Sequence, residues 1–377
     1  MSETLRSNSE EKEQGLSRES QQNIYCREKF IPEEAKQRVE ALIADFKNYY
    51  SSLGYKEEPP VSISSGVDPT VRFIGSHISV LKPYLVENRV PSPGLFMRQD
   101  CIRTQNADRL LDDDYHPNWG SYFPSIGAIT PPERLSESCN EAFDFFEKQL
   151  GISIENILVR INSSDADLLK ACEQRSGLAI EKDSRKPEYY KHKIGIEGIK
   201  GRSFNIALRD HDGRGFSDVG NIIIFEDAQK QLVVETALGS TTILKQLYGL
   251  DHVQDCTPVI GLDGIKNEAI RRKFEDAIIT STALYQDGLR PFGQHNRNRI
   301  LKQYVRSLSY FRAKSGISID GLTQIISAFE QREFLNPQEQ NAEVIAEFVR
   351  AFENDVFARK DLTEDEKKIK KSLKLLV

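Results

Sequence analysis

Apolar residues recur at steps of three and four in two segments of the chain, 33–53 and 341–357. This spacing places them on one face of an α-helix. Gly54 follows the first segment, as is common at a helix end. The apolar positions are Val39, Leu42, Ile43, Phe46 and Tyr50 in the first segment, and Val344, Ile345, Phe348, Val349, Phe352 and Val356 in the second. The pattern predicts an amphipathic helix at each place.

Between these two helices the pattern changes to short apolar and β-branched runs, which are separated by polar turns and favour strands. We expect 95–103 and 122–129 to pair as a hairpin, and 227–230 to form a turn. Beyond Gly261 only helical patterns occur. The predicted strands are 95–103, 122–129, 157–161, 206–208, 221–225 and 231–235, with helices at 132–150 and 164–173. The predicted fold class is therefore α+β, with a mostly antiparallel sheet flanked by helices and followed by an all-helical domain.

Composition fits a globular protein of two parts. Apolar residues make up 38% of the 377 residues and charged residues 29%, as in soluble domains. The first residues are rich in Ser, Glu and Gln and nearly free of apolar side chains, so they cannot bury enough surface to fold alone. We predict a disordered polar tail at 1–27, a sheet domain at 28–255, a helical domain at 262–362 and a charged C-terminal tail at 363–377.

Charge and cysteine usage exclude several classes of protein. The net charge of −6 argues against nonspecific coating of nucleic acid, although a local basic face remains possible. The five cysteines show no CxxC or Cys/His cluster, which predicts reduced thiols and no zinc site. No apolar run approaches membrane-spanning length, and the N-terminus has no apolar signal segment. We expect a cytoplasmic protein without a membrane partner.

The predicted strand 95–103 ends in Arg103, just before a polar loop that contains Asn106 and Asp108. The planar guanidinium of arginine stays charged and donates two parallel hydrogen bonds, which suits a phosphate group. An arginine here can clamp a phosphate oxygen while the loop folds over a nucleotide. The same pattern also fits an ion-paired arginine on the surface.

Several segments resemble, in the same order, the alanyl-tRNA synthetases of the class II aminoacyl-tRNA synthetase family. The resemblance extends over about residues 35–360. Its pieces are Asp68-Pro69-Thr70 with Lys82-Pro83, the motif-2-like Cys101-Ile102-Arg103, the return strand Tyr122-Phe123-Pro124-Ser125-Ile126-Gly127, the run Asn221 to Glu226, and the motif-3-like Val234-Glu235-Thr236-Ala237-Leu238-Gly239. It implies a class II catalytic domain and a helical tRNA-recognition domain.

The resemblance also assigns roles to individual residues. Arg103 would contact the α-phosphate of ATP and the substrate carboxylate, and so stabilise the transition state electrostatically. Glu226 would hold Mg²⁺ that is bound to ATP. Glu235 would bind the substrate amino group, with Gly239 and Ile223 also in the amino-acid site. Asp108, Phe123 and Gly127 would complete the ATP site.

The segment 285–302 resembles the start of the family's helical domain, which reads the tRNA acceptor stem. The resemblance implies tRNA contacts by Gln294, Arg297, Arg299 and Lys302. Basic side chains with amides can contact phosphates and the shallow minor groove of an RNA helix. Without the resemblance, an ordinary solvated helix face would explain the same charges.

Two residues depart from the family pattern. Pro124 stands where the family has a glutamate, and Thr242 stands where it has the arginine that grips the γ-phosphate. Lys245, three residues further along the same expected helix, lies on the same face and could partly replace that charge. No segment resembles the family's editing domain.

These features predict a stand-alone, truncated paralogue of alanyl-tRNA synthetase. Its expected activity is that of a ligase, which activates alanine or a similar small amino acid with ATP and transfers it to tRNA. Two alternatives stay open. One is a catalytically impaired tRNA-binding or regulatory paralogue, and the other transfers the aminoacyl group to a carrier protein or metabolite.

Overall fold

The computed structural model describes residues 25, 27–293, 295–334 and 340–376. In this part of the chain the strands form one nine-stranded sheet in the order β1-β2-β3-β9-β8-β7-β4-β5, with β6 on β7. The pairs β1–β2 and β4–β5 are parallel, and the other pairs are antiparallel. The strands are β1 (Lys56–Glu57), β2 (Leu95–Ile102), β3 (Tyr122–Thr130), β4 (Ile157–Asn162), β5 (Ala179–Asp183), β6 (Lys191–His192), β7 (Lys200–Arg209), β8 (Phe216–Glu226) and β9 (Gln231–Gly239).

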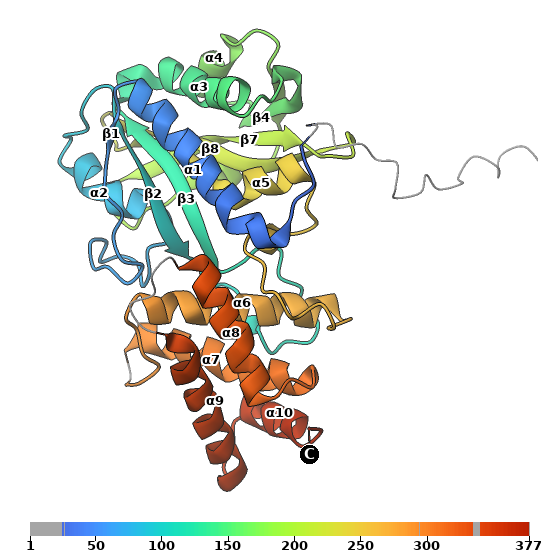
Figure 1. The fold of residues 1–377 in the computed structure, drawn as a ribbon. Coiled ribbons are helices and arrows are strands. Elements are labelled where there is room, and N and C mark those ends of the chain that lie inside the picture. Colours follow the sequence, from blue (N-terminus) through green and yellow to red (C-terminus); the bar gives the residue numbers. More distant parts are fainter. Residues whose placement is uncertain (1–24, 26, 294, 335–339, 377) are drawn as a thin grey trace, which may run out of the picture.

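Alternation of side chains along the strands gives the sheet two apolar faces. On one face, even-numbered residues of β2, β3 and β9 such as Phe96, Ile126 and Val234 pack under α1 (Ala35–Ser52), α3 (Leu135–Asp144), α4 (Ala166–Glu173) and α5 (Ser240–Tyr248). On the other, odd-numbered residues such as Met97 and Ile223 pack under α2 (Ile78–Val86). Figure 1 shows α1 and α5 crossing the sheet on the first face.

A helical region follows the sheet and lies beside one end of it (Figure 1). Its helices are α6 (Glu268–Gln286), α7 (Asn296–Lys314), α8 (Ile319–Glu333), α9 (Asn341–Ala358) and α10 (Glu364–Leu373). Helix α6 is buried on nearly all sides from Arg272 to Tyr285, because it packs against the other helices and also against the loop that precedes β3. None of the described helices is long and apolar enough to cross a membrane.

The predicted α+β fold class is confirmed. The hairpin of 95–103 with 122–129 is the antiparallel pair β2–β3, and the turn at 227–230 closes on the carboxylate of Asp227. The helix predicted at 132–150 is α3 continued by a π-helical turn, Phe145–Gln149. The pattern missed α2, which contains Pro83.

The expected C-terminal tail contains helix α10. Its side chains are mostly charged, but Ile369 and Leu373 are buried in the helical core at 2% and 3% exposure. Thr363 caps the helix, with its hydroxyl accepting from the Glu366 amide and the Glu366 carboxylate accepting from the Thr363 amide. The expected polar tail at 1–27 lies almost wholly outside the described residues.

Candidate active site

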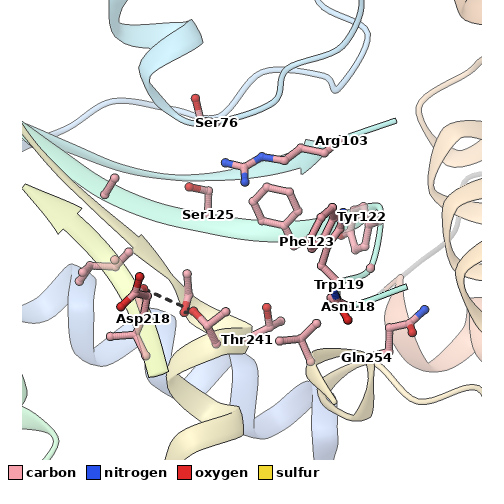
Figure 2. A pocket seen from close by; sticks show the side chains of 18 of the residues that line it. Ser76, Arg103, Asn118, Trp119, Tyr122, Phe123, Ser125, Asp218, Thr241 and Gln254 are labelled. Carbon is pink, nitrogen blue, oxygen red and sulfur yellow. Dashed lines mark hydrogen bonds between the residues drawn. The ribbon is translucent and has the colours of Figure 1, made fainter. Parts of the chain in front are cut away.

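A pocket of about 410 Å³ lies at one end of the sheet, where β3 and β8 begin and β9 ends. The start of α5 forms one wall, and the short helix Val253–Cys256 with α6 closes the side toward the helical region. The polar side chains around it include Ser76, Arg103, Asn118, Ser125, Asp218, Thr241 and Gln254 (Figure 2). Segments from both halves of the chain therefore build it.

Arg103 follows β2 directly and reaches into this pocket. Its guanidinium carbon lies 5.0 Å from the centre of the Phe123 ring, which is within the range of a cation–π contact. Its Nε donates to the carbonyl of Gly75 at 3.2 Å, and the side chain extends toward Ser76 and Ser125 (Figure 2). The structure thus brings together two of the residues expected at an ATP site.

Glu235 is buried beneath the pocket, with 1% of its surface exposed. Its Oε1 lies 2.9 Å from Nε2 of His77, which is itself fully buried. The other ring nitrogen, Nδ1, lies 3.0 Å from the Ser125 hydroxyl. The carboxylate expected to bind a substrate ammonium therefore faces a histidine of the same chain.

Gly127 makes room for this histidine. A Cβ at Gly127 would lie 2.1 Å from Nε2 of His77 and 2.5 Å from the carbonyl oxygen of Thr236. Gly127, expected at the ATP site, thus lies under the imidazole ring, and the described lining of the pocket does not include it. The sequence carried one signal for His77, namely its place between Asp68 and Lys82.

The Asp68 and Lys82 side chains fix the loop that carries His77. Lys82 donates to the Asp68 carboxylate and, at 2.9 Å, to the Thr70 hydroxyl, which in turn donates to Asp68 at 2.7 Å. Burial raises the pKa of Asp68, but the hydrogen bonds from Lys82 and Thr70 outweigh it and hold the pKa below the ordinary value. The resemblance to the Asp-Pro-Thr segment therefore marks a buried ion pair that positions the pocket.

The motif-3-like segment ends at Gly239, which precedes helix α5. Thr242 lines the pocket, and its hydroxyl donates to the carbonyl of Gly239 at 2.7 Å. A Cβ at Gly239 would lie 2.3 Å from that hydroxyl oxygen, so glycine allows this close turn. Lys245 lies one turn further along α5 and is not part of the described pocket lining.

Glu226 and Ile223 lie further along β8 than the part that lines the pocket, Asp218 to Asn221. Both oxygens of Glu226 accept from Nε of Arg202, at 3.0 and 3.1 Å. Arg202 also donates to Asp167. Because its carboxylate is held by an arginine and lies outside the pocket, Glu226 does not fit a magnesium ligand beside Arg103. Ile223 packs in the core under α2.

The acid-rich loop after Arg103 is held by the helical region. Asn106 donates to Asp276 of α6 at 3.0 Å, and the backbone and hydroxyl of Ser121 donate to the same carboxylate at 2.6 and 2.7 Å. Asp108 accepts from Gln303 of α7 at 3.0 Å and lines a second cavity, of about 750 Å³. The first part of the loop predicted to cover a nucleotide is therefore attached to the helical region, and Asp108 is not brought to the pocket, whereas Asn118 near the end of the loop does line it.

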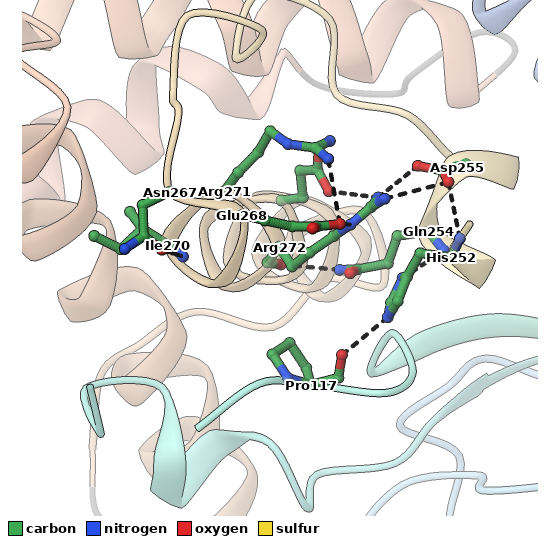
Figure 3. A network of polar contacts seen from close by, with 10 residues as sticks. Pro117, His252, Gln254, Asp255, Asn267, Glu268, Ile270, Arg271 and Arg272 are labelled. Carbon is green, nitrogen blue, oxygen red and sulfur yellow. Dashed lines mark hydrogen bonds and ion pairs between the residues drawn. The ribbon is translucent and has the colours of Figure 1, made fainter. Parts of the chain in front are cut away.

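A polar network holds the pocket wall at Gln254 (Figure 3). Its side-chain amide donates to the carbonyl of Arg272 at 3.0 Å. Nδ1 of His252 accepts from the backbone N–H of Gln254. Nε2 of the same ring therefore carries the proton and donates to the carbonyl of Pro117 at 3.0 Å. Burial, and then the charge of Arg272, lower the pKa of His252, so both disfavour the charged ring. Arg272 also pairs with Asp255.

The expected tRNA-binding residues lie at the start of α7. Arg297 donates to the backbone carbonyls of Ser65 and Arg72, at 3.2 Å for Ser65, so it holds the loop before α2. Arg299 is exposed and Lys302 is half-buried. Neither makes an ion pair within the part of the chain that the structure describes. Gln294 lies outside the described residues.

Sequence reasoning missed a polar group along the wall of β7 and β8. Asn221 donates to Asn205 at 2.6 Å, Asn205 donates to Asp218 at 2.7 Å, and Asp218 pairs with Arg160 at 2.6 Å. The two asparagines and Asp218 all line the pocket. Only the pairing of the two strands, with Asn205 opposite Asn221, brings them together.

Comparison with known proteins adds sequence similarity to this geometry. Alanine–tRNA ligase of Desulfitobacterium hafniense is 21% identical over an alignment of 318 positions, which covers 74% of this chain and 36% of the ligase. That of Acetivibrio thermocellus is 26% identical over 139 residues, 36% of this chain and 16% of the ligase. The chain is similar to alanine–tRNA ligases. The resemblance expected from the motifs is thus confirmed, and the chain spans about a third of these relatives or less.

Solved structures of aminoacyl-tRNA synthetases also align with the chain. Histidyl-tRNA synthetase of S. aureus aligns over 74% of this chain and 87% of its own, with a TM-score of 0.41 and 10% identity. Asparaginyl-tRNA synthetase of Entamoeba histolytica aligns over 60% and 66%, with a TM-score of 0.37 and 10% identity. No protein-family model matches the chain.

Proposed function

We propose that the pocket activates a carboxylic acid with ATP, as an aminoacyl-tRNA synthetase does. The observation that carries the proposal is Arg103 packed on Phe123 at the pocket. Among the described residues that line it, Arg103 is the one arginine or lysine. The α-phosphate would lie against its guanidinium, and the substrate carboxylate would attack phosphorus while pyrophosphate leaves. The arginine stabilises the charge that develops on phosphorus, with no covalent role.

The proposed acid is a small amino acid such as alanine, and the proposed acceptor is tRNA. Similarity to alanine–tRNA ligases supports both assignments. Glu235 is already in contact with His77. Among the described residues that line the pocket, the carboxylate is Asp218, which pairs with Arg160 at 2.6 Å, so a substrate ammonium would share it with that arginine. Magnesium would enter with the phosphates of ATP, because Glu226 is held by Arg202.

Amino-acid-dependent exchange between ATP and pyrophosphate tests this function across the twenty amino acids. We expect exchange with alanine, glycine or serine, and a loss on the order of 10²–10³ in Arg103→Ala. Arg109→Ala is the matched control, because Arg109 lies in the same loop, pairs with Asp112 on the surface and is outside the pocket. Exchange that is unchanged in Arg103→Ala would contradict the proposed role.

A second candidate is RNA binding without catalysis. The occupied Glu235 and the hydroxyl of Thr242 in place of an arginine favour it. Filter binding of tRNA would then be retained by folded protein that shows no exchange with any amino acid. The double variant Arg299→Ala with Lys302→Ala should weaken binding and lower its salt dependence by about 0.7 for each phosphate that is no longer neutralised. Arg350→Ala, on the exposed side of α9, is the control.

A further inference from the structure

Three side chains at the pocket and directly beneath it form a row that the proposed activation step does not use. The hydroxyl of Ser125 lies 3.0 Å from Nδ1 of His77, and Nε2 of the same ring lies 2.9 Å from Oε1 of Glu235. His77 and Glu235 are 0% and 1% exposed, whereas Ser125 is 6% exposed and lines the pocket. A hydroxyl, an imidazole and a carboxylate in this order are the parts of an activated nucleophile.

The backbone is arranged around this row. Ser125 and Gly127 lie on the same face of β3, and Gly127 pairs with Ala237, two residues from Glu235 on β9. The imidazole lies against Gly127, where a Cβ would come within 2.1 Å of it. Ser125 is thus on one side of the ring and Glu235 on the other. Glycine inside a strand weakens the strand, and here its absent side chain is what admits the ring.

The neighbours of His77 favour one tautomer. Nε2 lies 2.9 Å from Oε1 of Glu235 but makes no hydrogen bond to any described residue in this arrangement. A carboxylate has no proton to donate, so its negative charge favours the ring proton on Nε2, and Nδ1 then accepts from the Ser125 hydroxyl, 3.0 Å away. This is the protonation state in which histidine acts as a general base toward serine.

We propose that Ser125 is the nucleophile of an acyl-transfer step. His77 is its base, and Glu235 positions the ring and stabilises the positive charge that the ring gains. The acyl donor is a carboxylic acid activated as its adenylate, so this part of the proposal rests on the proposed function. Oγ of Ser125 attacks the acyl carbon and its proton passes to Nδ1 of His77. The bond between the acyl carbon and the phosphate oxygen breaks, AMP departs with the electron pair, and His77 returns the proton to AMP.

The acyl group is then an ester on Ser125. An acceptor hydroxyl gives its proton to His77 and attacks the ester carbon, and the same proton returns to Oγ of Ser125 as the bond to it breaks. Arg103 extends toward Ser125 from the end of β2 (Figure 2). Among the described residues that line the pocket, Arg103 is the one arginine or lysine. It would stabilise the negative charge that develops on the acyl oxygen in both steps.

A fluorophosphonate probe tests the nucleophile without any adenylate. We expect one covalent adduct in the intact mass, mapped to Ser125 by peptide mass spectrometry and lost in Ser125→Ala. His77→Gln should slow labelling on the order of 10²-fold, the contribution of a general base. Glu235→Gln should slow labelling as well. Glu235→Asp should recover part of the labelling rate without a change in melting temperature. A carboxylate with a purely structural role would not give this recovery.

Ser138→Ala is the matched control. Ser138 is also buried beside β9, but its hydroxyl contacts Thr236, 3.3 Å away, and no histidine. Labelling should be unchanged in this variant. Absence of an adduct at Ser125 in folded wild-type protein, or labelling at the wild-type rate in His77→Gln, overturns the proposal. Labelling of Ser125 without ATP–pyrophosphate exchange would support the nucleophile and count against the proposed activation step. Exchange without labelling would support the activation step and count against the nucleophile.

Discussion

At the scale of single residues, a glycine decides what lies beneath the pocket. Gly127 leaves the space that the His77 ring fills, and the ring in turn covers Glu235. Arg103 supplies the pocket with a cation, whereas Thr242 supplies a neutral hydroxyl that donates to the carbonyl of Gly239. Each of these effects depends on one side chain and its immediate neighbours.

The variant Gly127→Ala tests the role of this glycine. Its Cβ would meet a buried ring and a backbone carbonyl, so we expect a loss of about 1–3 kcal/mol in the free energy of unfolding. Urea denaturation measures the change. Gly264→Ala is the control because a Cβ there meets nothing within 4 Å, and it should alter stability by less than about 1 kcal/mol. Equal effects in both variants would show that crowding at His77 is unimportant.

At the scale of elements, two charged segments gain their structure from packing. The loop after β2 is rich in acids, and its side chains bind α6 and α7. Helix α10 is charged at most positions, yet it turns Ile369 and Leu373 into the helical core. A few apolar residues at helical spacing are enough, because tertiary burial supplies most of the stability of a short helix.

Ile369→Ala tests the docking of α10. Removing a buried isoleucine side chain costs about 2–5 kcal/mol, and Ile369 is 2% exposed. We expect a lower midpoint of urea unfolding and faster hydrogen exchange in α10. Lys374→Ala, at the exposed end of the same helix, should leave both unchanged. An unaltered midpoint in Ile369→Ala would mean that α10 contributes little to stability.

At the scale of the whole molecule, Asp276 joins the sheet to the helical region. It is 1% exposed on α6 and accepts from Ser121 and Asn106 of the loop between β2 and β3. Burial raises its pKa, which hydrogen bonds from Ser121 and Asn106 offset only in part. The pocket opens where these two parts meet, so this carboxylate also supports the position of the loop beside Arg103.

The raised pKa predicts a dependence of stability on pH. The native state holds the Asp276 proton more tightly than the unfolded state, whose carboxyl has a pKa of about 3.9. The contribution of Asp276 is therefore fully present below that value, and it is lost as pH rises through the raised native pKa. Asp276→Asn cannot titrate, so the fall in unfolding free energy above pH 4 should become shallower, as measured by urea denaturation at successive pH values. An equal slope in both proteins would contradict the shift.

The sequence by itself determined many of the elements and their broad order, but not α2 or α10. Apolar spacing was enough for α1, the β2–β3 hairpin and the change to helices after the sheet, because these depend on local periodicity. The resemblance also located Arg103 and Phe123, which follow directly from the end of β2 and the start of β3. Tertiary structure alone decided which partner each polar side chain faces. His77 meets Glu235, Arg202 holds Glu226 and Asp276 holds the loop of Asp108, since these contacts join residues far apart in the chain.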